Sequence, residues 1–76
     1  MPITPAMQEE LDLLNIFNLD TTQQGIKIHH TAAPGRIAAG QRLYAKGLIT
    51  QGDGGYLTPL GQQAVEHVKA LVALLA

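Results

Sequence analysis

The chain has 76 residues, which leaves room for a single domain over residues 1–76 with a modest core. It has no cysteine, which excludes disulfides and thiolate-metal sites, and only 4% of its residues are aromatic. Its formal net charge is -1, from 5 Lys and Arg against 6 Asp and Glu, whereas dedicated nucleic-acid binders usually carry a basic excess. We therefore expect one small domain with an aliphatic core that gains extra stability by oligomerisation.

The sequence carries no sign of membrane insertion or export. Its N-terminus lacks a signal-peptide pattern, and its longest apolar run, residues 70–76, is far too short to cross a bilayer. We therefore expect a cytoplasmic protein with no membrane partner.

A first helix is predicted over residues 4–17. Thr4 can cap its free amides, and Pro5 suits the first helical position. Glu9 and Glu10 lie early in the helix, where the helix dipole favours anions. The apolar face of this helix comprises Met7, Leu11, Leu13, Leu14 and Phe17.

Residues 20–23 have the form of a capping box for a short helical turn, with Asp first and Gln three residues later. Residues 26–29 then alternate apolar and polar side chains, which is the period of a strand. We expect Ile26 and Ile28 to face the core and Lys27 and His29 to face the solvent.

A second main helix is predicted to begin within residues 31–34 and to end at Gly47, which suits a left-handed cap. On a helical wheel one side of it, expected to face the core, comprises Ile37, Gly40, Leu43 and Tyr44. The opposite side comprises Ala38, Gln41, Arg42 and Ala45.

A hairpin follows, with strands at residues 48–50 and 56–58 and a glycine-rich turn at residues 51–55. Thr58 and Pro59 then start a last helix that runs nearly to the final residue. The element order predicts an α+β, mostly helical domain with three main helices and a small two- or three-stranded antiparallel sheet.

Residues 36–61 resemble the second half of a winged-helix domain, through the segments at residues 43–49 and 56–61. The whole chain also resembles a family of small bacterial proteins of unknown function, through residues 17–19, 25–30 and 46–51. Members of that family are often labelled DNA-binding proteins or regulators. The resemblance implies a winged-helix-like fold and a DNA-binding role.

Under the DNA hypothesis, Gln41, Arg42 and Lys46 lie on the outward face of the second main helix and contact double-stranded DNA. Arg36 adds a phosphate contact. Two features weigh against this hypothesis. Asp53 in the hairpin turn would repel phosphates, and the interval before the helix is too short for the supporting helix of a helix-turn-helix.

The last helix carries more apolar side chains than one small core needs. An apolar surplus of this kind marks an interface, and a terminal helix suits a two-fold contact between identical chains. We expect a homodimer whose interface comprises Val65, Val68, Leu71, Val72 and Leu75.

No motif for catalysis or for metal or cofactor binding is present. His29 and His30 point to opposite faces if they lie in a strand, so with His67 they cannot readily form a metal site. We therefore expect no enzymatic activity, no catalytic residue, no metal and no cofactor. The sequence favours a DNA-binding, regulator-like protein, and the alternative is a homodimeric protein-interaction module of the same fold without DNA binding.

Overall fold

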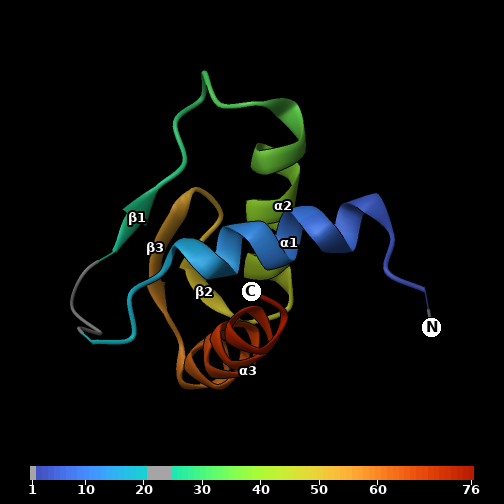
Figure 1. The fold of residues 1–76 in the computed structure, drawn as a ribbon. Helices are drawn as coiled ribbons and strands as arrows, with labels where there is room; N and C mark the ends of the chain where they lie inside the picture. The colour runs from blue at the N-terminus through green and yellow to red at the C-terminus, as the bar shows by residue number, and fades with distance from the viewer. Residues whose placement is uncertain (1, 21–24) are drawn as a thin grey trace.

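A computed structural model describes residues 2–20 and 25–76 and has the predicted α+β, mostly helical fold (Figure 1). The elements in chain order are α1 (Pro5–Ile16), β1 (Ile26–Lys27), α2 (Pro34–Ala45), β2 (Ile49–Gln51), β3 (Gly54–Leu57) and α3 (Pro59–Leu75). The capping box predicted at residues 20–23 falls mostly on residues outside the described part of the chain.

The helix starts follow from local sequence. Each helix begins with a proline, whose missing amide would have no helical partner at that position. The hydroxyl of Thr4 caps α1 by accepting from the amide of Met7 at 3.1 Å. The hydroxyl of Thr58 accepts from the Gly61 amide at 3.0 Å and donates to the Gly47 carbonyl at 2.6 Å, so it caps α3 and ties it to the end of α2.

The three strands form one antiparallel sheet in the order β1-β3-β2. The first strand is shorter than predicted, although the Ile28 amide extends the pairing by donating to the Asp53 carbonyl at 2.7 Å. Ile28 is buried and Ile26 is partly buried, as predicted, while Lys27 and His29 are exposed. This strand order, with α2 directly before the hairpin, is compatible with a winged-helix-like topology.

The hairpin differs from the prediction because two of its glycines lie in a strand. Gly54 and Gly55 begin β3 at φ of 121° and 74°, and the turn narrows to the two residues before them. Ile49 pairs with Leu57, and Gln51 pairs with Gly54. One residue of β2 but two residues of β3 lie between these pairs, so the ladder contains a bulge. Gly47 ends α2 with φ of 78°, as its predicted left-handed cap requires.

One core lies where the helices and the sheet meet. Its buried members are Leu13, Leu14, Phe17, Ile28, Ala39, Leu43, Ile49, Val65 and Val68. The buried face of α2 is rotated from the predicted one: Ala39 and Leu43 are buried, whereas Tyr44 is 52% exposed. The rotation brings the flank with Arg42 and Lys46 against α1, where both pair with Glu10.

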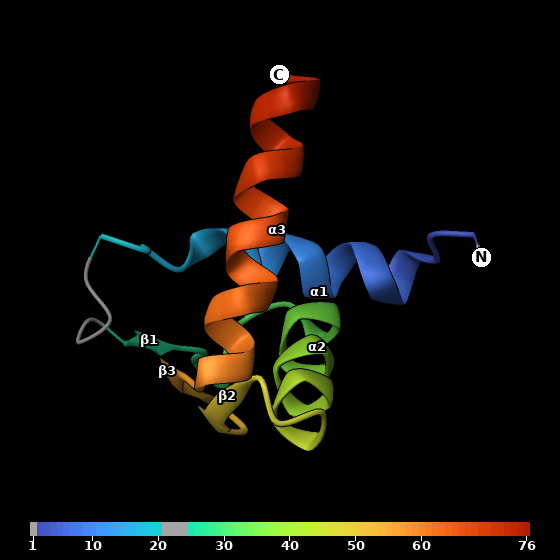
Figure 2. The same cartoon turned by 90° about the horizontal axis from the view of Figure 1, so that it is seen from below.

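Figure 2 shows α3 crossing α1 and continuing well beyond it, so that the last turns of α3 stand clear of the rest of the domain. Residues 28–33, between β1 and α2, form no helix. As the sequence predicted, no supporting helix therefore lies directly before α2. Among the described residues, no helix combines the length and apolar character needed to cross a membrane.

Candidate functional site: a basic helix flank and a free helix end

Two of the four predicted DNA contacts, Arg42 and Lys46, are partly exposed and pair with a carboxylate of α1. The Nε of Arg42 donates to Oε2 of Glu10 at 3.3 Å, and Lys46 Nζ donates to Oε1 of the same carboxylate. Arg42 also donates from Nη2 to the Ala6 carbonyl at 3.1 Å. Glu10 is 7% exposed, so the pair of cations serves to neutralise a buried charge. The two side chains remain partly exposed, at 37% for Arg42 and 55% for Lys46, but their charged groups are paired within the chain.

The remaining three cations lie on three different elements. Lys27, on the sheet, pairs with Asp53 over 3.0 Å, and Lys69, on α3, donates to the Asn15 carbonyl. Arg36 lies half-buried in the first turn of α2 and has no ion pair within the described part of the chain. Gln41 is exposed on α2. Among the described residues, four of the five cations are thus engaged with a carboxylate or a backbone carbonyl of this chain.

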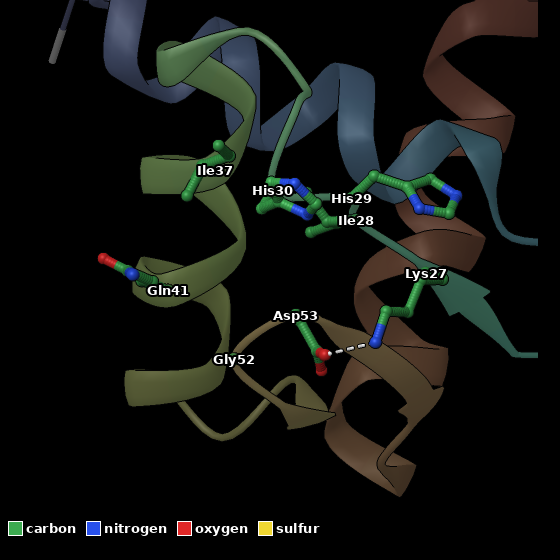
Figure 3. Close-up of a pocket in the computed structure, with 8 residues that line it drawn as sticks. All are labelled: Lys27, Ile28, His29, His30, Ile37, Gln41, Gly52 and Asp53. Atoms are coloured by element: carbon green, nitrogen blue, oxygen red, sulfur yellow. Dashed lines mark hydrogen bonds and ion pairs between the residues drawn. The ribbon is translucent and has the colours of Figure 1, made fainter.

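A polar pocket of about 380 Å³ opens between α2, the hairpin turn and the segment after β1 (Figure 3). Figure 3 shows the His30 ring directed toward α2 and the His29 ring directed away from it. The Lys27 ammonium, which donates a hydrogen bond to Asp53 and attracts its charge, holds the pKa of that carboxyl below its ordinary range. The turn carboxylate is thus engaged with a cation of the adjacent strand.

The predicted dimer interface divides into two parts. Val65 is fully buried and Val68 is 7% exposed, because both pack into the core of their own chain. Val65 is therefore a core residue and not an interface residue, whereas Val68 also lines the groove between α1 and α3. Leu71, Val72 and Leu75 are exposed, together with Leu74, and all four lie in the last turns of α3.

A groove of about 330 Å³ runs along the junction of α1 with this free end of α3. Its apolar lining comes from both helices and from the segment before α1, and includes Ile3, Leu11, Leu71, Val72 and Leu75. Asp12 and His67 contribute polar lining. The groove, with Leu71, Val72 and Leu75 on its α3 side, is the apolar surface that we call the α3 end. Leu74 is exposed about 200° around the helix from Val72 and lies outside it.

The pairing of Glu10 with α2 was not predicted, although the sequence carries a signal for it. This residue lies three positions after Met7 and four before Leu14, so it shares the inner face of α1 with them. A carboxylate on the inner face of a helix needs a cationic partner, and α2 supplies two. The expectation that Glu10 acts only as a charge at the helix start was incomplete.

Within residues 2–20 and 25–76, no group of three or more His, Asp or Glu side chains is placed to hold a metal ion. No curated protein and no solved structure matches the chain significantly. A family profile described as "Family of unknown function (DUF5669)" matches residues 1–76. The chain therefore belongs to this uncharacterised family of small proteins.

Proposed function

We propose that this protein is a homodimeric protein-interaction module of winged-helix-like fold, and that a second copy of the chain covers the α3 end. The observation that carries the proposal is the exposure of four large apolar side chains on the last turns of one helix. Leu71, Val72, Leu74 and Leu75 are 48%, 44%, 82% and 78% exposed. A contiguous apolar patch on a small domain typically marks an interaction site.

The amount of exposed apolar surface is in the range that a dimer requires. The exposures of Leu71, Val72 and Leu75, which line the groove, amount to about 1.7 fully exposed side chains. Their burial is worth about 3–5 kcal/mol for each chain, or about 5–10 kcal/mol for a pair, at about 1.5–3 kcal/mol for each side chain. Association costs about 4–15 kcal/mol, so a second copy of the same surface supplies a gain of the required size.

Sedimentation velocity at micromolar concentration tests the proposal. Wild-type protein is expected to sediment as a dimer, and Leu75→Glu as a folded monomer, because the new carboxylate would be buried without a partner in the dimer. Ala73→Glu is the matched control, since Ala73 is exposed and lies about 200° around α3 from Leu75. A wild-type monomer at these concentrations would overturn the proposal, as would equal loss of dimer in both variants.

A second candidate function is DNA binding, and the observation that favours it is the strand order with α2 directly before the hairpin. Against it stand the negative net charge and the pairing of Arg42 and Lys46 with Glu10. For DNA to be bound through these side chains, they would have to leave Glu10, which would remain buried without a partner.

Electrophoretic mobility shifts on genomic fragments at about 50 mM and about 150 mM salt test this candidate. If α2 contacts DNA, Arg36→Ala and Lys46→Ala should weaken binding, and Lys46→Ala should reduce the salt slope by about one unit. Absence of a shift at the lower salt concentration would eliminate DNA binding and leave the interaction module.

A further inference from the structure

We infer that the two copies join with their α3 helices antiparallel, and that the tip of each helix enters the groove between α1 and α3 of the other. This inference rests on the proposed homodimer and specifies how its partner sits. It also makes the groove a composite site, lined by one chain and filled by the other.

One face of α3 is buried against the chain's own core along the first half of the helix and is exposed along the second half. Val65, Val68, Val72 and Leu75 follow one another at intervals of three, four and three residues, so they share a face of the helix. The first two are buried in the chain's own core, and the last two are exposed. The face therefore continues past the core, where it is only partly covered.

Helix α1 lies on this same face of α3. Leu11, Asp12 and Asn15 of α1 line the groove together with Val72 and Leu75 of α3. Lys69 of α3 also donates to the backbone carbonyl of Asn15, which fixes α1 at that level of the helix. A partner helix on this face can thus extend along α3 only as far as α1.

The position of α1 on this face excludes a dimer in which the two α3 helices run parallel. Each helix with its side chains is about 10–12 Å across, so two α1 helices would separate the α3 helices by well over 20 Å at the level of Val68. Packed helices lie about 8–10 Å apart. Val72 and Leu75 follow only about 6 Å and 10 Å further along the helix, too short a distance for the two axes to converge.

An antiparallel pair avoids this collision because each domain lies beyond the tip of the other chain's helix. The free segments, residues 69–75, overlap over about 10 Å, and the two-fold axis passes near Val72. Leu75 of the partner subunit then lies level with Lys69, beside α1. The groove of about 330 Å³ opens at that level, so it receives the partner's tip.

The absence of cysteine allows a direct test by single substitutions. In the antiparallel pair, Val72→Cys faces its own copy and should form a disulfide-linked dimer under mild oxidation. Leu75→Cys should not form a disulfide with its own copy. In the antiparallel pair the two copies of position 75 are separated by about 9 Å along the helix axis alone, and a disulfide spans at most about 7 Å between Cα atoms. A mixture of Leu75→Cys and Asp12→Cys should give a mixed disulfide, because Asp12 is exposed on the groove wall.

Before oxidation, sedimentation of each reduced variant establishes that it is dimeric. If the shorter cysteine side chain weakens the dimer, the protein concentration is raised until the variant is dimeric. Efficient linking of both Val72→Cys and Leu75→Cys to themselves would indicate a parallel pair and would overturn the inference while leaving the homodimer intact. A dimer that links at neither position and gives no mixed disulfide would overturn both the arrangement and the interface. A wild-type monomer would remove the proposed function itself.

Discussion

Arg42 donates a hydrogen bond from Nε to the buried carboxylate of Glu10 over 3.3 Å, and this contact joins α2 to α1. Lys46 binds the other oxygen of the same carboxylate. The cations are 37% and 55% exposed at their side chains, whereas the Glu10 side chain is 9% exposed. The free-energy cost of removing charge from water therefore falls almost entirely on the Glu10 carboxylate. Either cation alone can still offset part of this cost.

This asymmetry predicts non-additive substitutions. Arg42→Met and Lys46→Met should each lower the free energy of unfolding by about 1 kcal/mol, because the other cation still pairs with Glu10. The double variant should lose about 3–5 kcal/mol, because it leaves a buried charge without a partner. Adding Glu10→Met to the double variant should recover most of the loss. Urea denaturation measures all four proteins, and strictly additive losses would contradict this account.

A second prediction concerns the close approach of α3 to the segment after α2. A Cβ on Gly61 would lie 1.9 Å from the backbone oxygen of Leu48, so Gly61→Ala requires a backbone shift. We expect a loss of stability of about 1–3 kcal/mol or more, as for other overpacked sites. Gly35→Ala is the control, since its Cβ would meet only the flexible Glu9 side chain at 3.5 Å. Thermal unfolding should show Gly35→Ala unchanged or stabilised, because alanine favours the helix.

The two threonine caps should differ in their contribution to stability. Thr58 accepts from the Gly61 amide and also donates to the Gly47 carbonyl, whereas the Thr4 hydroxyl bonds, among the described residues, only to the Met7 amide. Thr4→Ala should cost about 1 kcal/mol, as is typical of a lost cap. Thr58→Ala should cost about 2 kcal/mol, because the link between α2 and α3 is lost as well. Equal losses on chemical denaturation would show that the second hydrogen bond contributes nothing.

The hairpin turn should show a small dependence of stability on pH. Lys27 lowers the pKa of Asp53 in the folded chain, first through the hydrogen bond and then through charge attraction. Because the folded pKa lies below the unfolded one, this contribution is complete above the unfolded value, about 3.9 for Asp, and is lost as pH falls through the folded pKa. The stability difference between wild type and Lys27→Met should therefore vanish at low pH.

Carboxyl NMR titration checks the same contact directly. Lys27→Met should raise the pKa of Asp53 toward its ordinary value, whereas Lys69→Met, which removes a cation from a different element, should leave it unchanged. An unaltered Asp53 titration in Lys27→Met would show that the ion pair is not maintained in solution.

The local signals in the sequence predicted the elements, because the atoms that decide helix ends and turns are close together in the chain. Thr4, Thr58 and Gly47 act in the structure as their patterns indicated. The hairpin register was missed because Gly54 and Gly55 suit either a tight turn or a bulge, and pairing with β1 decides between them.

The candidate sites depended on tertiary packing, which spacing along one helix does not fix. A helical wheel gives the relative directions of Arg42 and Gln41 but not the direction from which α1 approaches. In the same way, an unbroken apolar face on α3 does not reveal where α1 crosses it. That crossing assigns Val65 and Val68 to the core and leaves Val72 and Leu75 uncovered.

The projection of α3 beyond α1 has a consequence for local folding. Turns that lack tertiary contacts keep their helical hydrogen bonds only through intrinsic propensity, which is weak in short segments. Amide protons in a single chain should therefore exchange slowly around Val65 and progressively faster from Leu71 onward. If a second copy covers this segment, dilution will accelerate exchange at these amides before it affects the core. Helix formation at the end of α3 and association of the chains would then be one coupled equilibrium.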